Sequence, residues 1–255
     1  MKLDIYNQNF CLIDPICFPI FKTKGDRGVL LIHGFTGSPH DMAYLAQRLF
    51  DEGFTVSVPR LPGHGTNHMD FLNSTWQDWV RRSIDAYLDL TSVCDKISIV
   101  GLSMGALLAT IVASRLKTEK VVLAAPAFKV TDWRLKFTPF MGLFVQYKEK
   151  EPPIFEDPSL NKLAQEYWNK VFIKPAAQLY KLQKIATKSL EMVDSPTLVI
   201  VTQKDNTVPM SVLDVIREHL KSEFKTVVLE KSAHPVTNDI EKELVAEKIA
   251  EFLSN

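Results

Sequence analysis

Short, continuous apolar runs recur along this chain and are separated by stretches with helical periodicity. The runs lie at residues 29–35, 96–102, 120–126, 196–202 and 224–230. Runs of this length without polar alternation are typical of strands that are buried on both faces of a parallel sheet. Residues 54–59 predict a further strand. The region 3–22 predicts a small antiparallel start, in which Pro15 and Pro19 limit regular pairing.

The stretches between these runs have the apolar period of amphipathic helices. They cover residues 39–52, 75–90, 104–117, 209–221 and 238–253. A chain in which strands and helices alternate forms βαβ units, and helices then cover both faces of the sheet. The pattern therefore predicts an α/β fold with a mostly parallel central sheet.

Residues 127–192 interrupt this alternation, because they contain no buried β run. The stretch is rich in aromatic side chains, namely Phe128, Trp133, Phe137, Phe140, Phe144, Tyr167, Trp168, Phe172 and Tyr180. A structureless loop of this length is rare in a compact domain. We therefore expect a core formed by 1–126 and 193–255, with 127–192 as a helical cap insertion over one edge of the sheet.

Composition and charge argue against some classes of partner and of metal site. Thirty basic and thirty acidic side chains cancel, and no polybasic run occurs, so we expect no nucleic-acid partner. No apolar run approaches the ~20 residues of a membrane helix, and the first residues lack the features of a signal peptide. We expect a cytoplasmic protein without stable membrane insertion. Cys11, Cys17 and Cys94 lack the spacing of a disulfide framework or a zinc site, and we interpret them as small apolar side chains.

The motif Gly101-Leu102-Ser103-Met104-Gly105 matches G-x-S-x-G and lies between a predicted strand and a predicted helix. The turn is so sharp that the serine takes a strained backbone conformation, and larger side chains at Gly101 and Gly105 would clash. The start of the following helix directs free N–H groups toward developing negative charge. We predict Ser103 as a nucleophile; the alternative is a glycine-flanked serine in an ordinary turn.

A serine hydroxyl needs a base to act as a nucleophile at neutral pH. In folds with this motif the base follows the serine in the chain, which leaves two histidines. His219 lies within a helical run, whereas His234 follows the last strand, at the carboxyl edge of the sheet where ligands bind. We therefore predict His234 as the base.

The acid that orients the base should lie on a loop after a strand, between Ser103 and His234. Asp205 meets this condition, whereas Asp194 precedes its strand and Asp214 lies within a helix. A carboxylate here would fix the tautomer of the histidine and stabilise its protonated form. The alternative is an aspartate that closes a turn or caps a helix.

Residues 33–37 follow the first central strand and include glycines that let backbone amides approach a substrate. We predict an oxyanion hole formed by the N–H groups of Phe35 and Met104. His33 and Gly34 belong to this loop; His33 either braces it or is simply a buried histidine with satisfied hydrogen bonds. His64 and His68 lie four residues apart but lack helical context and a third ligand, so we expect no metal site. The glycines form no dinucleotide or phosphate-binding motif, so we expect no cofactor.

Together these segments resemble the bacterial carboxylesterase and monoacylglycerol lipase group of α/β-hydrolases. The resemblance is carried by residues 33–39, 59–65 and 101–105, by Asp205 followed by Val208-Pro209, and by Ser232-Ala233-His234. It implies hydrolysis of esters with small to medium acyl chains, a cap over the site, and no cofactor. It implies Ser103, Asp205 and His234 as a catalytic triad, with Phe35 and Met104 as oxyanion donors. Ala106 departs from the glycine of many such proteins, and the cap matches least.

The sequence therefore predicts a serine esterase or monoacylglycerol lipase of lipid metabolism. Its substrate would be a small-molecule ester with an apolar acyl group, cleaved through an acyl-enzyme on Ser103. Two alternatives stay open. The same triad could act on amides, thioesters or carbon–carbon bonds, or transfer the acyl group to another acceptor. The fold could also serve a ligand-binding receptor.

Overall fold

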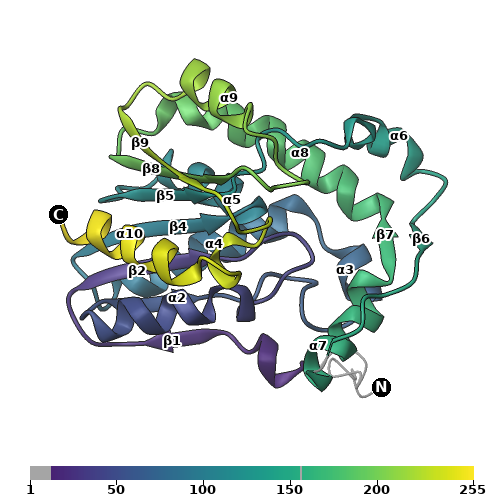
Figure 1. The fold of residues 1–255 in the computed structure, drawn as a ribbon, viewed down its shortest axis with the longest axis horizontal. Coiled ribbons are helices and arrows are strands. Elements are labelled where there is room, and N and C mark those ends of the chain that lie inside the picture. The colour runs from purple at the N-terminus through teal and green to yellow at the C-terminus, as the bar shows by residue number, and fades with distance from the viewer. Residues whose placement is uncertain (1–12, 156) are drawn as a thin grey trace, which may run out of the picture.

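A seven-stranded sheet forms the centre of the computed structural model, which describes residues 13–155 and 157–255 (Figure 1). The strand order is β1-β3-β2-β4-β5-β8-β9. The strands are β1 (Ile20–Lys22), β2 (Arg27–Ile32), β3 (Thr55–Val58), β4 (Lys96–Leu102), β5 (Val121–Ala124), β8 (Thr197–Thr202) and β9 (Phe224–Leu229). Strand β1 pairs antiparallel with β3, and the other neighbouring pairs among the described strands of this sheet are parallel. The predicted α/β fold with a mostly parallel sheet is confirmed.

The two edges of the sheet compare differently with the predicted strands. Every residue of β3, β5 and β8 is buried, as the apolar runs predict, whereas β9 has three exposed residues. The expectation of full burial at 224–230 was wrong because β9 is an edge strand with a single neighbour. At the other edge, the predicted antiparallel start corresponds to β1, and residues 3–12 of that prediction lie outside the described residues.

Helices cover both faces of the sheet. Their bounds are α2 (His40–Asp51), α3 (His68–Asn73), α4 (Trp76–Thr91), α5 (Met104–Ala113), α8 (Ile173–Ser189), α9 (Val212–His219) and α10 (Lys242–Ser254). Leu30 and Ile32 of β2 join one apolar cluster with α4, α5, α8 and α9. Val29 and Leu31 join a second cluster with α2 and α10. Successive strand residues thus face opposite layers, and α10 crosses in front of the sheet in Figure 1.

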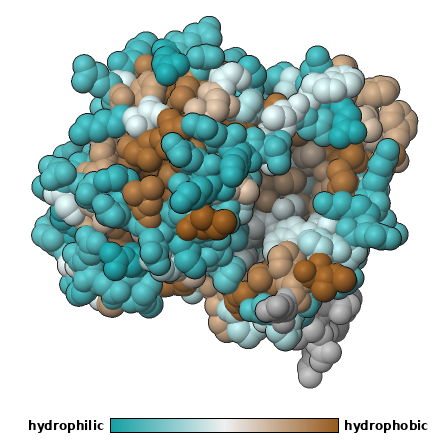
Figure 2. Space-filling model, in the orientation of Figure 1, coloured by the Kyte–Doolittle hydropathy of each residue, from teal (hydrophilic) through white to brown (hydrophobic). Residues whose placement is uncertain are grey.

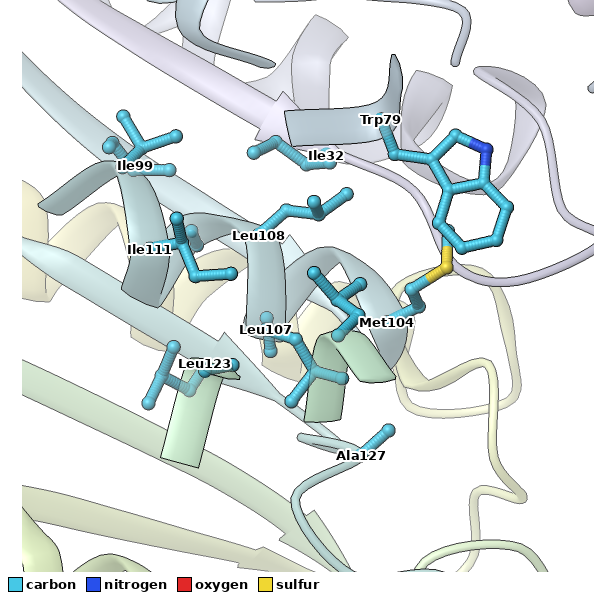
Figure 3. Close-up of a cluster of buried hydrophobic side chains, with 14 of the residues drawn as sticks. Ile32, Trp79, Ile99, Met104, Leu107, Leu108, Ile111, Leu123 and Ala127 are labelled. Atoms are coloured by element: carbon cyan, nitrogen blue, oxygen red, sulfur yellow. The ribbon is translucent and has the colours of Figure 1, made fainter. Parts of the chain in front are cut away.

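Helix α5 is buried along its whole length, from Met104 to Ala113. Figure 3 shows Leu107, Leu108 and Ile111 of this helix among side chains of the strands, including Ile99 and Leu123. Helix α5 ends four residues earlier than the predicted helix 104–117. Because the helix is enclosed, its first residue and the serine before it are held in place by packing.

Residues 127–192, called the insertion below, connect β5 to β8. They contain 3-10 turns at Trp133–Phe137 and Leu190–Met192, α6 (Thr138–Met141), β6 (Tyr147–Glu149), α7 (Pro158–Leu163), a π turn at Ala164–Trp168, β7 (Lys170–Phe172) and α8. We expected a helical insertion; besides its helices it contains β6 and β7, which form an antiparallel pair. Each of these strands has three residues, too few for an alternating pattern. Among the described residues, no helix is long and apolar enough to cross a membrane.

Candidate active site

Ser103 lies at the junction of β4 and α5. Its backbone, with φ 56° and ψ −113°, has a conformation that residues other than glycine rarely adopt. Two glycines make this sharp turn sterically feasible. A Cβ at Gly101 would overlap the carbonyl oxygen of Gly105, and a Cβ at Gly105 would overlap that of Ile32 in the neighbouring strand. The Ser103 N–H donates to the Ala124 carbonyl at 2.8 Å, which ties the strained residue to β5. The turn therefore presents the Ser103 side chain at the carboxyl edge of the sheet.

The structure brings the three predicted triad residues into one hydrogen-bonded chain. His234 Nε2 lies 2.7 Å from Ser103 Oγ, and His234 Nδ1 lies 2.7 Å from Asp205 Oδ2. Asp205 follows β8 and His234 follows β9, so all three residues lie where parallel strands end. Two residues that the sequence set aside have other partners: Asp214 pairs with Arg217, and His219 lies beside Glu191.

Asp205 is held as a carboxylate on the far side of the histidine. Burial raises the pKa of this group, but hydrogen bonds from His234 and from the N–H groups of Val208 and Thr207 outweigh it, so the pKa is lowered overall. The two N–H groups donate to Oδ1 at 2.9 and 2.7 Å, which leaves Oδ2 for the histidine. A carboxylate at Oδ2 favours the proton on Nδ1 of His234. Nε2 is then free to accept the proton of Ser103.

The two predicted oxyanion donors adjoin Ser103. A Cβ at Gly34 would lie 3.3 Å from Ser103 Cβ, so the loop that carries Phe35 passes directly beside the serine. Within residues 13–155 and 157–255, no acceptor engages the N–H of Phe35 or of Met104. The side chain of Met104 points toward the indole of Trp79 in the buried cluster (Figure 3). Both N–H groups are therefore available to an oxygen bound at Ser103.

A cavity of about 430 Å³ adjoins Ser103 and His234. The core contributes Phe35, Leu102 and the polar residues His40, Asp41 and Asn238. The described residues of the insertion that line the cavity are Pro153, Phe155, Leu160 and Trp168, all with largely apolar side chains. Figure 2 shows the surface hollowed between the sheet side of the molecule and the side that carries the insertion. The cavity can accept a small molecule with an extended apolar part.

A model of the alpha/beta hydrolase family matches residues 29–247, which include the serine turn and both of its partners. The chain belongs to the alpha/beta hydrolase family. The match covers most of the sheet as well as the insertion, so the family resemblance seen in the sequence is confirmed.

Proteins similar to this alpha/beta hydrolase include two Bacillus enzymes. A thermostable monoacylglycerol lipase of Bacillus sp. (strain H-257) is 31% identical, over 92% of this chain and 94% of its own length. A carboxylesterase of Bacillus subtilis (strain 168) is 27% identical, over 90% of this chain and 93% of its own. A solved structure of metagenome-derived lipolytic enzymes superposes with a TM-score of 0.83 at 26% identity, covering 95% of this chain and 99% of that one.

In this alpha/beta hydrolase, His33 connects the loop that carries Phe35 to a second loop, residues 59–66. His33 Nδ1 lies 3.0 Å from the Gly34 carbonyl oxygen, and its Nε2 accepts the Leu61 N–H at 3.2 Å. Burial lowers the pKa of His33 to about 4, so the ring is neutral and donates through Nδ1. The Gly34 carbonyl and the Phe35 N–H share one planar trans peptide and point in opposite directions. The bond from His33, together with the bond that the Gly37 N–H donates to the same carbonyl at 3.2 Å, therefore orients the Phe35 N–H.

The two histidines that sequence spacing pairs, His64 and His68, have different surroundings. His64 is fully buried beside His33, with ring centroids 5.1 Å apart, and its Nδ1 lies 3.0 Å from the Pro62 carbonyl oxygen. His68 bonds instead to Glu166 of the insertion at 3.0 Å. No cluster of three potential metal ligands occurs in the part of the chain that the structure describes.

No sequence motif marks the described residues of the insertion that line the cavity. Trp168 is one of many aromatic residues in 127–192, and Pro153, Phe155 and Leu160 belong to no motif. Their apolar character was a general signal for a cap interior. Which of the apolar residues reach the cavity depends on contacts between segments distant in the chain, and no periodic pattern records these contacts.

Proposed function

We propose that this chain is a carboxylic ester hydrolase that acts through an acyl-enzyme on Ser103. The observation that carries the proposal is the hydrogen-bonded chain Ser103–His234–Asp205 at the wall of an apolar cavity. The similarity to a monoacylglycerol lipase and to a carboxylesterase supports ester substrates.

Acylation begins when Ser103 Oγ attacks the ester carbonyl and His234 Nε2 accepts the hydroxyl proton. The carbonyl oxygen becomes negatively charged and is bound by the N–H groups of Phe35 and Met104. One such donor contributes roughly 3 kcal/mol to stabilisation of the transition state. The intermediate collapses as His234 returns the proton to the leaving alcohol, and the acyl group remains on Ser103.

Deacylation repeats these steps with water. His234 accepts a proton from the water, whose oxygen attacks the acyl carbonyl, and the carboxylic acid leaves as Ser103 Oγ regains the proton. Asp205 keeps the imidazole in the required orientation and stabilises its protonated form. Apart from the water and the ester, these steps involve side chains and backbone groups of this chain.

The substrate class follows from the walls of the cavity. We propose that residues 127–192 act as a cap on a core formed by 1–126 and 193–255. In this arrangement Phe155, Leu160 and Trp168 contact the acyl chain, which favours apolar aliphatic or aromatic acyl groups. Monoacylglycerols and simple alkyl esters both have this chemistry.

A panel of p-nitrophenyl esters from acetate to palmitate tests the proposal, with monoacylglycerol included to separate a lipase from a general esterase. We expect turnover by the unaltered protein and a loss of at least about a thousandfold in kcat for Ser103→Ala, because the triad acts as a unit. Ser114→Ala is the matched control, since Ser114 follows the buried end of the same helix and its hydroxyl donates to the Ile111 carbonyl, away from the cavity.

Two outcomes would contradict ester hydrolysis. If Ser103→Ala retains the rate, Ser103 is not the nucleophile. If no ester is turned over but an alkyl fluorophosphonate still labels Ser103, the alternatives of another acyl chemistry or a ligand-binding receptor are favoured.

A further inference from the structure

Tyr167 of the insertion is anchored to the loop 59–66 of the core, about a hundred residues earlier in the chain. The side chain is 1% exposed. Its hydroxyl accepts the Thr66 N–H at 2.8 Å and donates to the Gly63 carbonyl at 3.1 Å. One buried hydroxyl thus satisfies two backbone groups, and removing it would leave both without a partner.

A second contact lies beside it but is more exposed. Glu166 Oε2 lies 3.0 Å from both the backbone N and Nδ1 of His68. These two side chains are 36% and 29% exposed, so solvent screens the pair, and its contribution is small. Of these two contacts with the core, the buried Tyr167 hydroxyl is therefore the stronger one.

The residue after Tyr167 lines the catalytic cavity. Tyr167 and Trp168 close the π turn Ala164–Trp168, a rare geometry that often occurs at functional sites. The two rings have different neighbours. The ring centroid of Tyr167 lies 5.8 Å from that of Phe71 in α3, whereas the ring centroid of Trp168 lies 5.5 Å from that of Phe155 in the cavity wall. Because the two residues are adjacent in one turn, a shift of Tyr167 would also move Trp168 at the cavity wall.

The loop that Tyr167 holds is also bonded to His33. Leu61 of this loop donates to His33 Nε2, and His33 Nδ1 bonds to the Gly34 carbonyl. The same peptide carries the Phe35 N–H. A continuous series of bonds thus joins the Tyr167 hydroxyl to an N–H group beside Ser103.

We propose that Tyr167 is a positioning residue that links the acyl-facing wall of the cavity to the oxyanion donor of Phe35. This inference rests on the proposed ester hydrolysis at Ser103. Loss of the hydroxyl releases loop 59–66, so His33 and the Phe35 N–H are held less firmly. It also releases the Trp168 wall, which only longer acyl chains reach.

The two consequences differ in kinetics, and a merely structural role would produce neither. For Tyr167→Phe we expect kcat to fall about tenfold for every ester, the equivalent of one net hydrogen bond. We expect KM to rise for octanoate and laurate esters but not for acetate. Tyr180→Phe is the matched control, because the Tyr180 hydroxyl bonds to no group among the described residues. Trp168→Leu should change the chain-length preference alone.

A double-mutant cycle tests the connection through His33. If Tyr167 acts through His33, Tyr167→Phe should lower kcat less than about twofold in a His33→Gln background, compared with about tenfold in the unaltered protein. Additive effects of the two substitutions would overturn the inference. So would unchanged kcat and KM in Tyr167→Phe.

A measurement that needs no turnover separates this inference from the proposed function. The Nδ1–H of His33 is buried. Its proton should exchange with solvent at least several-fold faster in Tyr167→Phe than in Tyr180→Phe, as measured by nitrogen-15 NMR. An unchanged exchange rate overturns the coupling even if the chain hydrolyses no ester. If exchange is faster in Tyr167→Phe but the unaltered protein hydrolyses no ester, the faster exchange supports the coupling. The missing activity then counts against the proposed function alone.

Discussion

His33 shows how one buried side chain makes stability depend on pH. Burial lowers its pKa from the ordinary value of 6.5 to about 4, and burial lowers the pKa of the neighbouring His64 in the same direction. In the unfolded chain the His33 ring therefore binds a proton near pH 6.5, whereas in the folded chain the same ring binds it only near pH 4. Stability from this source is fully present above pH 6.5 and is lost as the pH falls toward 4.

We expect the free energy of unfolding to fall by about 2 kcal/mol between pH 6.5 and pH 5 through His33 alone. Urea denaturation at the two pH values should show a smaller fall in His33→Gln, because glutamine does not titrate. His219→Gln is the control, since His219 lies near the surface beside Glu191. The same fall in His33→Gln as in the unaltered protein would refute this account.

Helix α4 shows how a local signal specifies the start of an element. The Asp78 N–H donates to Thr75 Oγ1 at 3.4 Å, and the Thr75 N–H donates to Asp78 Oδ2 at 2.9 Å. This reciprocal capping box satisfies N–H groups that the helix itself leaves unpaired. The helix then packs Trp79 into the core beside Met104.

Removing the cap should weaken the protein without altering the site. We expect Thr75→Ala to lower the free energy of unfolding by about 1 kcal/mol in urea titration. Thr91→Ala, at the exposed end of the same helix, should change it by less than about half as much, because the Thr91 hydroxyl donates to the Leu88 carbonyl of its own helix and satisfies no unpaired N–H group. Equal effects at both ends would mean that the capping box contributes nothing specific.

At the scale of the whole molecule, the insertion exposes a cluster of large apolar side chains. Trp133, Phe137, Phe140, Leu143 and Phe144 are between 48% and 76% exposed. Figure 2 shows apolar residues gathered at the side of the molecule where α6 lies. Rings this exposed contribute little to folding but offer a surface to apolar probes.

Replacing two of these rings should therefore change the surface but not the stability. We expect Phe140→Ser combined with Phe144→Ser to reduce the fluorescence of a bound apolar dye such as ANS, with a change in stability within about 0.5 kcal/mol per site. Phe18→Ser combined with Phe21→Ser, in exposed positions elsewhere, should reduce it less. A large loss of stability would mean that the two rings pack more tightly than their exposure indicates.

Much of the sheet and of the serine turn was predictable because both depend on local patterns. Buried parallel strands produce continuous apolar runs, and the turn at Ser103 requires glycine on both sides. The pairing of Ser103 with Asp205 and His234 was also predictable, because residues that follow parallel strands meet at one edge of the sheet. The exposure of β9 was not, since its edge position follows from strand order.

By itself, the sequence determined the alternation of strands and helices and the three residues that meet at the strand ends. Only the tertiary structure decided which insertion residues line the cavity and how the Phe35 N–H is oriented. The reason is physical. Tyr167 bonds to Thr66 and Gly63 across 101 and 104 residues, and such contacts arise from packing of the complete chain. No local period encodes them.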